Sequence, residues 1–425
     1  MKLPAIPLVV LDTETTGLVP RVNRVIEFAA VRIENGKTVA QYEQLFSIPT
    51  EIPETVQVLT RIRPSDLKDQ PTLEEKRDEI LKIIGDDAII VGQNVGFDIR
   101  MLRGEGIDLS QHPWIDTSMV ASLVFPELLS YSLGYVSTVL NLKHEPVHRA
   151  MGDVNATLEL LSRCWERFLE LPHELYEVAQ TIMEKSAPGY QRLFQALPQP
   201  TATSTPHWLS LPGSAPVPPV HDSQLSNAVF HKPEQGTLSL VEEPLNPTTL
   251  QQLLTATTKD PHTVHWIAVK NLDATLRRIA IPDGVCVLSP PEHLLDLDAA
   301  ALFAAQKSFT ADEGTLALKM AWFEPETQCS VRLHGEEYSI WNGKLACTDR
   351  SPAYRDQFND PPSVLLLDHR QLLQFLADPE HCAHGALDER AHIIIDDASM
   401  LEDTATKAYG WFCNLDHLRA GAEGD

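Results

Sequence analysis

Short apolar runs separated by polar turns fill the first part of the chain, and their spacing predicts alternating strands and helices. The strand-like runs cover residues 6–12, 25–33, 38–47 and 88–93. Asn35-Gly36 separates the second run from the third, and Asn-Gly is typical of a tight hairpin turn. Apolar residues recur at helical spacing in 72–84 and 154–170. This mixture predicts an α/β layer fold.

The pattern changes after a further helical stretch at 173–197. Residues 198–233 contain eight prolines and no hydrophobic period, which is typical of an extended linker. Beyond it, 363–367 and 391–396 are fully apolar runs of the kind found inside parallel sheets. We therefore divide the chain into a first domain (1–172), a helical connector (173–197), a proline-rich linker (198–236) and a second α/β lobe (237–425).

A chain of 425 residues suits two or three domains. With 43% hydrophobic and 22% charged side chains, its composition is that of a globular protein. No apolar run approaches the length of a membrane span. Asp12 and Glu14 interrupt the first apolar stretch too early for a signal peptide. The six cysteines include no CxxC pair. We therefore expect a cytoplasmic protein with reduced thiols and no membrane partner.

The charge balance limits how the chain can hold a nucleic acid. With 34 basic and 59 acidic side chains, the net charge is −25. Such a balance counts against a broad basic surface that coats DNA. Any nucleic acid partner would therefore be held locally, by metal ions and a few side chains.

Two acidic side chains come at the end of the first predicted strand. Residues at i and i+2 of a strand point the same way, so Asp12 and Glu14 should project together. Open α/β sheets bind ligands at this edge. The alternative is a strand that ends in ordinary acidic surface residues.

Two further acidic positions and a histidine fit the same edge. Asp98 follows the strand at 88–93, where it could also serve as a helix N-cap. His148 and Asp153 precede and begin the helix at 154–170. On one continuous helix they would lie about 140° apart, so His148 must belong to the entering loop if both face one site. Otherwise His148 is an ordinary surface histidine.

Asp12, Glu14, Asp98, His148 and Asp153, in this order, resemble the signature of the DEDDh exonucleases, the family of the proofreading subunit of bacterial replicative polymerases. The resemblance covers about residues 5–170 and implies an RNase H-like fold. It also implies that the four carboxylates bind two Mg²⁺ or Mn²⁺ ions and that His148 is the general base. By the same resemblance, the substrate-binding residues are Thr15, Thr16, Gly17, Leu18, Asn94 and Phe97. One departure is Gln93, where the family usually has histidine.

The expected reaction is hydrolysis of DNA from the 3′ end, on single strands, with release of nucleoside 5′-monophosphates. RNA remains an alternative substrate, because no feature of the sequence reads the 2′-hydroxyl. An accessory nuclease of an ATP-driven helicase is another alternative, and a catalytically dead scaffold is a third. The four intact carboxylates argue against the scaffold.

The end of the chain is similar to part of the DinG/XPD-type iron–sulfur helicases. His392–Asp403 resembles their DEAH strand, and 351–373 resembles the segment after their cluster cysteines. The likeness is eroded, because Asp397 and Ser399 replace the motif's Glu and His. The alternative reading of this strand end is an acidic cap of the next helix.

The residues that would serve an iron–sulfur cluster or ATP are missing from this lobe. Ser351 stands where a cluster cysteine is expected, and only Cys329 and Cys347 remain as candidates, so we expect no cluster. Gly36-Lys37-Thr38, the one GK[ST] match, falls in the predicted hairpin, so we expect no ATP site. The proline-rich linker further suggests that the nuclease domain folds alone.

Overall fold

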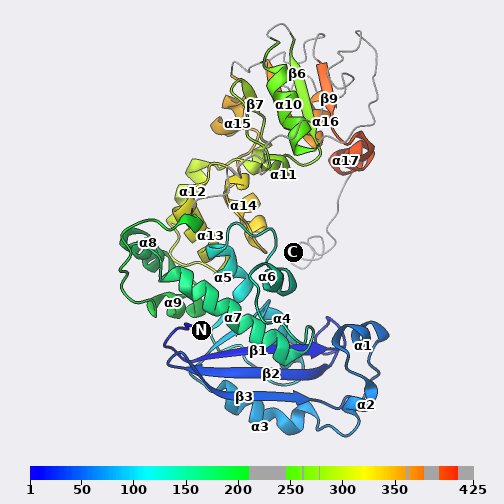
Figure 1. Cartoon of the computed structure of the whole chain (residues 1–425), viewed down its shortest axis with the longest axis vertical. Coiled ribbons are helices and arrows are strands. Elements are labelled where there is room, and N and C mark those ends of the chain that lie inside the picture. Colours follow the sequence, from blue (N-terminus) through cyan, green and yellow to red (C-terminus); the bar gives the residue numbers. More distant parts are fainter. Residues whose placement is uncertain (210–245, 261–262, 277, 360–362, 378–391, 410–425) are drawn as a thin grey trace, which may run out of the picture. The chain divides into compact units, whose positions relative to one another are not determined.

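The computed structural model describes residues 1–209, 246–260, 263–276, 278–359, 363–377 and 392–409 (Figure 1). The chain forms two compact units that do not follow chain order. The first consists of residues 1–211, 298–325 and 330–344, and the second of residues 212–297, 326–329 and 345–425. Most of the predicted linker, 210–236, lies outside the described residues. Among the helices of the described ranges, none has both the length and the apolar character needed to cross a membrane.

The first unit contains a five-stranded mixed sheet. Its strands are β1 (Leu8–Thr15), β2 (Val25–Glu34), β3 (Lys37–Leu45), β4 (Ile89–Gly92) and β5 (Trp114–Asp116). The spatial order is β3-β2-β1-β4-β5. β2 is antiparallel to both of its neighbours, β1 and β3, whereas β4 and β5 are parallel to β1. Positive φ angles at Asn35 and Gly36 form the predicted hairpin turn between β2 and β3. The expected RNase H-like sheet is therefore confirmed.

Helices cover both faces of this sheet. They are α1 (Glu54–Thr60), α2 (Pro64–Leu67), α3 (Leu73–Ile84), α4 (Gly96–Gly104), α5 (Thr117–Val124), α6 (Leu133–Val139), α7 (Ala150–Phe168), α8 (His173–Met183) and α9 (Pro188–Gln195). A 3₁₀ turn, η1 (His207–Leu209), ends the described part of this stretch. The helices predicted at 72–84 and 154–170 match α3 and α7.

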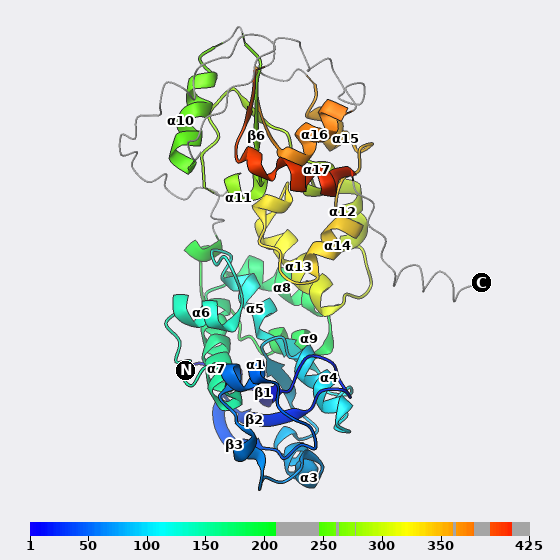
Figure 2. The ribbon, with the colours of Figure 1, turned by 90° about the vertical axis from the view of Figure 1, so that its right-hand side faces the viewer.

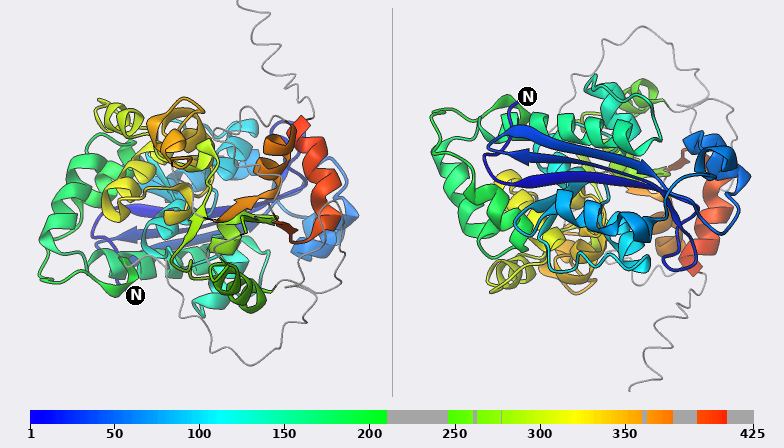
Figure 3. Two further views of the ribbon diagram at one scale, coloured as in Figure 1. Left: turned by 90° about the horizontal axis from the view of Figure 1, so that it is seen from above. Right: turned by 90° about the horizontal axis from the view of Figure 1, so that it is seen from below.

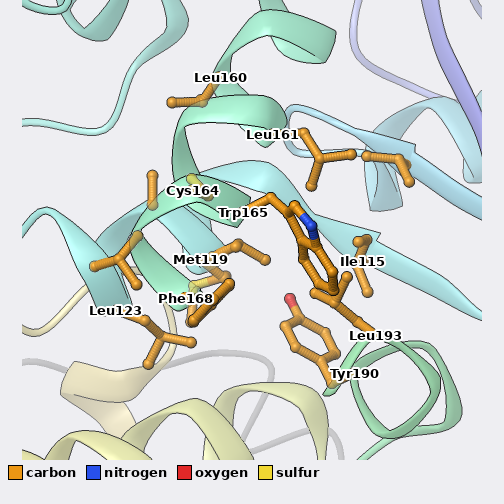
Figure 4. Packing of buried hydrophobic residues seen from close by; sticks show 14 of the residues in the cluster. Ile115, Met119, Leu123, Leu160, Leu161, Cys164, Trp165, Phe168, Tyr190 and Leu193 are labelled. Carbon is orange, nitrogen blue, oxygen red and sulfur yellow. The ribbon is translucent and has the colours of Figure 1, made fainter. Parts of the chain in front are cut away.

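Alternation along β1 divides the interior into two cores. Leu8 and Val10 belong to a core with α5, α7 and α9, whereas Val9 and Leu11 pack with α3 and α4. The sheet therefore lies between two helical layers, as Figure 3 shows for β1–β3. In the first core, Trp165 and Phe168 of α7 lie close to Tyr190 of α9 and Met119 of α5 (Figure 4). This packing holds α5, α7 and α9 together on one face of the sheet.

Three helices from the predicted C-terminal lobe complete the first unit. They are α12 (Leu297–Ala304), α13 (Ala311–Phe323) and α14 (Glu337–Lys344). The first unit includes α12 from residue 298 onward. α13 packs against α5 and α8 (Figure 2). The indole of Trp322 lies against Phe168 and Trp208, with ring centroids 6.5 and 6.2 Å away. The compact unit that contains the RNase H-like sheet therefore extends beyond residues 1–172.

The second unit contains an all-parallel sheet of four strands. These are β6 (His265–Val269), β7 (Val285–Val287), β8 (Val364–Asp368) and β9 (His392–Ile395), in the order β7-β8-β6-β9. Its helices are α10 (Pro247–Thr257), α11 (Leu272–Leu276), α15 (Pro352–Asp356), α16 (His369–Ala377) and α17 (Leu401–Tyr409), with 3₁₀ turns η2 (Pro291–His293), η3 (Gln328–Ser330) and η4 (Ala398–Met400). β8 and β9 confirm the two apolar strands predicted from the sequence.

Candidate active site

Asp12 and Glu14 emerge from the end of β1 as the alternation of side chains predicts. One oxygen of each carboxylate and one of Asp153 lie within 4.8 Å of one another. Glu14 also lies opposite Glu27 in the antiparallel register of β1 and β2. Three carboxylates from a strand and a distant helix therefore converge on one point.

Asp98 joins this group through the residue between the two acidic positions of β1. It lies in the first turn of α4 and is 3% exposed. The backbone N–H and the hydroxyl of Thr13 both donate to its Oδ1, at 2.9 and 2.6 Å. The helix N-cap is Val95, so the alternative reading of Asp98 as a cap is wrong. Thr13 holds Asp98 beside β1, a role that the sequence analysis missed.

Burial and mutual repulsion oppose the ionisation of all carboxylates in the site at once. Burial, with the neighbouring carboxylates Asp98 and Asp153, raises the pKa of Asp12 well above its usual value. Burial and the charge of Asp153 raise the pKa of Glu14 to about 8. Burial likewise raises the pKa of Asp98 to about 7, although the hydrogen bonds from Thr13 act in the opposite direction. The site therefore concentrates negative charge that protons or cations must neutralise.

The start of α7 supplies the remaining predicted residues. Asp153 lies in the first turn of the helix, whose N-cap is Arg149, and His148 lies on the entering loop with φ +58°. The predicted loop-to-helix placement is thus confirmed. His148 is exposed. A different histidine, His144, contacts Asp153, with Nε2 2.8 Å from Oδ1. No spacing rule connects His144 to Asp153, so this contact is not predictable from the sequence.

A buried ion pair fixes the beginning of α7 to the sheet. Glu27 is fully buried on β2, and its carboxylate accepts bonds from Nε and Nη2 of Arg149 at 2.6–3.1 Å. The same carboxylate accepts the N–H of Ala150, the first residue of α7, at 3.0 Å. The pair satisfies an otherwise unpartnered helix N-terminus and sets the position of Asp153. Glu27 and Arg149 are 122 residues apart, so no local pattern in the sequence connects them.

The residues expected to contact substrate lie around the same strand ends. At the end of β1, the Thr15 hydroxyl donates to the Gly17 carbonyl at 2.7 Å. In the loop that follows, the Thr16 hydroxyl accepts the backbone N–H of Arg24 at 2.9 Å. Leu18 is 79% exposed, which is unusual for a leucine. This loop therefore presents an apolar side chain to solvent.

The turn between β4 and α4 has a different character. Asn94 adopts a left-handed conformation with φ +56° and is exposed, and Phe97 is half-buried. Gln93 is tied inward, since its amide donates to the Tyr131 carbonyl at 2.6 Å and accepts from the Thr117 hydroxyl at 2.7 Å. The departure at Gln93 therefore has a structural role in this chain.

The donor set fits a hard divalent cation. Asp12, Glu14 and Asp153 offer only carboxylate oxygens, the ligands that Mg²⁺ and Mn²⁺ prefer. The raised pKa values of Asp12 and Glu14 are those of carboxylates that lie close to other carboxylates. These three residues form the candidate metal site.

Comparison with known proteins identifies the first domain. The family model described as Exonuclease matches residues 9–161. The DNA polymerase III subunit epsilon of Aquifex aeolicus is 34% identical over 165 residues, which are 37% of this chain and 80% of that protein. The PolC-type DNA polymerase III of Thermotoga maritima is 36% identical over 182 residues, 42% of this chain and 13% of the polymerase.

A third relative is named DinG, but it matches this chain in the exonuclease region and not in the second unit. The protein named 3'-5' exonuclease DinG of Bacillus subtilis is 30% identical over 170 residues, 39% of this chain and 18% of that protein. The chain thus spans under a fifth of the length of its PolC-type and DinG relatives. It covers most of the epsilon subunit, however, at 34% identity. The chain therefore belongs to the exonuclease family, and residues 9–161 form a DnaQ-like exonuclease domain.

Proposed function

We propose that the chain is a metal-dependent 3′→5′ exonuclease that removes nucleoside 5′-monophosphates from the 3′ ends of single-stranded DNA. The observation that carries the proposal is the convergence of Asp12, Glu14 and Asp153 within 4.8 Å, beside the buried Asp98. DNA is favoured over RNA because the epsilon and PolC-type relatives are DNA polymerase components by name. RNA stays the alternative substrate.

The four carboxylates would hold two Mg²⁺ or Mn²⁺ ions. Bound divalent cations would neutralise the carboxylates and stabilise negative charge on the attacking and leaving oxygens. Asp12, Glu14 and Asp153 supply the converging ligand atoms. Asp98 supplies the fourth carboxylate, with Thr13 holding Oδ1 in a fixed orientation. Thr13 therefore acts as a positioning residue rather than as a ligand.

His148 is the proposed general base. In its neutral form it accepts a proton from the water that attacks phosphorus, and the bond from phosphorus to O3′ breaks. The products are a nucleoside 5′-monophosphate and a strand shortened by one nucleotide. Its exposed position on the loop before α7 suits a residue that meets substrate at the mouth of the site. Thr15, Thr16, Gly17, Leu18, Asn94 and Phe97 are the proposed contacts to the terminal nucleotides.

The second unit is proposed to be an eroded helicase-like lobe without an ATP site or an iron–sulfur cluster. Its all-parallel sheet supports the proposal, as do β8 and β9, which carry the resembling segments. At the carboxyl ends of β6 and β9, Nζ of Lys270 lies 3.6 Å from the carboxylate of Asp397. The turn after β6 has no glycine-rich sequence that could cradle phosphates. We therefore expect no ATP-driven unwinding.

Product analysis tests this proposal. Single strands labelled at the 3′ or the 5′ terminal nucleotide, as DNA and as RNA, are incubated with the full chain and Mg²⁺, with and without ATP. We expect immediate release of labelled mononucleotide from 3′-labelled DNA and a descending ladder from 5′-labelled DNA, unaffected by ATP. Faster cleavage of RNA would reassign the substrate. Release that begins at the 5′ end would overturn the proposal.

A further inference from the structure

A histidine, a cysteine and an aspartate converge in the second unit, away from any residue assigned above. They are Asp273 in α11, His293 at the end of η2 and Cys329 in η3, and one ligand atom of each lies within 4.8 Å of the others. Oδ1 of Asp273 lies 2.5 Å from Sγ of Cys329 and 3.1 Å from Nδ1 of His293. All three side chains are half-buried.

The fold brings these residues together from three separate segments. The chain leaves the second unit after residue 297 and re-enters it at residue 326, so His293 and Cys329 flank this excursion. Backbone pairing holds the two segments side by side, through an antiparallel bridge between Leu294 and Thr327 and a 3.0 Å bond from Leu295 N to Glu326 O. The cluster is therefore built on fixed backbone rather than on flexible side chains alone.

The buried Nδ1 atom of His293 lies 3.1 Å from the Asp273 carboxylate, the distance of a histidine–aspartate ion pair. Imidazole is the commonest metal ligand in proteins, and a carboxylate and a thiol beside it complete a mixed set of metal-binding side chains.

The donor set selects the metal. Thiolate, imidazole and carboxylate together suit Zn²⁺, whereas Mg²⁺ and Mn²⁺ prefer oxygen ligands only. Three protein ligands leave one tetrahedral position for water. Ligand atoms around tetrahedral zinc are about 3.5 Å apart, so the side chains need to separate by about 1 Å from their present contacts.

We propose that Asp273, His293 and Cys329 bind one Zn²⁺ ion. This ion is independent of the metal ions of the exonuclease site, because no residue is shared. It fastens α11 to the two segments where the chain leaves and re-enters the second unit. Binding of the metal therefore stabilises the second unit and requires the thiolate form of Cys329.

The experiment measures zinc bound to the full-length chain in a background that cannot bind metal at the exonuclease site. Asp12→Asn with Glu14→Gln provides that background. Zinc content is measured by mass spectrometry after equilibrium dialysis against buffered Zn²⁺. Cys329→Ser and His293→Asn each replace one ligand by an uncharged side chain that binds Zn²⁺ poorly. Cys286→Ser is the matched control, because Cys286 is also half-buried in the second unit but lies outside the cluster.

We expect one zinc ion per chain in the background protein and in the Cys286→Ser control. Cys329→Ser and His293→Asn should each weaken binding by at least about 100-fold. With Co²⁺ in place of zinc, the thiolate-to-metal absorption band should appear in the control and vanish in Cys329→Ser. Circular dichroism of the metal-free variants verifies that they are folded. Unchanged zinc content in both ligand variants, no zinc in the background protein, or iron with acid-labile sulfide instead of zinc would each overturn the proposal.

Discussion

Two histidines near α7 have different surroundings, and this difference separates their expected roles. His148 is exposed on the entering loop, whereas Nε2 of His144 lies 2.8 Å from the metal-site residue Asp153. His148→Ala should lower the rate of nucleotide release by about 10²–10⁴-fold at every Mg²⁺ concentration, since a general base is lost. His144→Ala should instead raise the Mg²⁺ concentration for half-maximal rate by about 10–100-fold, since Asp153 loses its positioning partner.

A titration of the rate against Mg²⁺ distinguishes these outcomes. At saturating Mg²⁺ the His144→Ala variant should regain most of the wild-type rate, and the His148→Ala variant should not. A wild-type rate in His148→Ala would exclude this histidine as the base. A low rate in His144→Ala that no Mg²⁺ concentration restores would assign His144 a more direct part.

The carboxylate site should make the metal-free chain less stable as the pH rises. The folded-state pKa values of about 8 for Glu14 and about 7 for Asp98 exceed those of unfolded carboxylates, near 4. The folded state therefore keeps protons that the unfolded state releases, and its stability falls between about pH 4 and pH 8. Asp12→Asn removes one charge from the group and should reduce this loss, by on the order of 1–2 kcal/mol near pH 8.

Urea unfolding in EDTA at about pH 5.5 and about pH 8 measures the effect. Asp86→Asn is the control, since Asp86 is exposed and outside the site. The Asp12→Asn variant should exceed the wild type in stability mainly at the higher pH, and the control should follow the wild type. Equal pH dependence in all three proteins would contradict the electrostatic account of the site.

Among individual site residues, the sequence could predict only those placed by local pattern. Asp12 and Glu14 share a face because strand geometry fixes side chains at i and i+2. The partners of those carboxylates are distant in sequence: Thr13 and Asp98 are 85 residues apart, and Glu27 and Arg149 are 122 apart. No spacing rule encodes such contacts, so they emerge only from the folded packing.

The start of α7 depends on one close approach between elements. A Cβ on Gly152 would lie 2.1 Å from the carbonyl oxygen of Pro146, an atom of backbone that cannot move away cheaply. Gly152→Ala should therefore displace the loop that carries His148. We expect a loss of about 1–3 kcal/mol in unfolding free energy and a marked loss of nuclease rate.

Gly134→Ala is the matched control. Gly134 is also helical, in α6, and a Cβ there meets no atom within 4 Å. This change should leave activity intact and raise stability by up to about 1 kcal/mol, the helix preference of alanine over glycine. Thermal unfolding and the rate of nucleotide release measure both variants. Equal behaviour of the two would show that the approach to Pro146 does not matter.

Element prediction succeeded where hydrophobic period was strong. The strands β1–β4 and the helices α3 and α7 were predicted within about four residues. β1, β2 and β4 are buried apolar runs, and α3 and α7 repeat apolar residues at helical spacing. β3 is mostly exposed, and the Asn-Gly turn before it marks where it begins. β5 and β7 have three residues each, too few for a period to appear. β6 was also missed, although its five residues are all buried. A buried run of that length does not distinguish a strand from a helix.

At the scale of the whole molecule, the first unit depends on residues from far along the chain. The side chains of Lys319 in α13 and Glu337 in α14 are completely buried, and their charged atoms are 2.5 Å apart. Nζ of Lys319 also donates to the Ser122 hydroxyl of α5 at 2.8 Å. Burial lowers the pKa of Lys319 and raises that of Glu337, and their mutual attraction opposes both shifts. These contacts predict that α13 and α14 contribute to the stability of the first unit.

Disrupting this pair should destabilise the exonuclease unit from a distance. Glu337→Gln leaves a buried lysine without its counter-charge, and we expect a loss of about 3–5 kcal/mol. Glu336→Gln is the matched control, because Glu336 is exposed, and it should change stability by less than about 0.5 kcal/mol.

A chain that ends near residue 197 lacks α13 and α14 altogether and should be destabilised in the same direction. The nuclease activity that remains after heating is measured for the full chain, the two variants and the shortened chain. A shortened chain as heat-resistant as the full chain would show that the C-terminal helices contribute nothing.

If the converging carboxylates form the active site of a metal-dependent 3′→5′ exonuclease, removing one of them must abolish nucleotide release. Wild-type, Asp12→Asn and Asp86→Asn chains are compared on a 3′-labelled DNA single strand with Mg²⁺. We predict that the wild type and Asp86→Asn release labelled nucleoside 5′-monophosphate at equal rates, that EDTA stops both, and that Asp12→Asn, although folded, releases none. Undiminished release by Asp12→Asn, or release that EDTA does not affect, would contradict the claim.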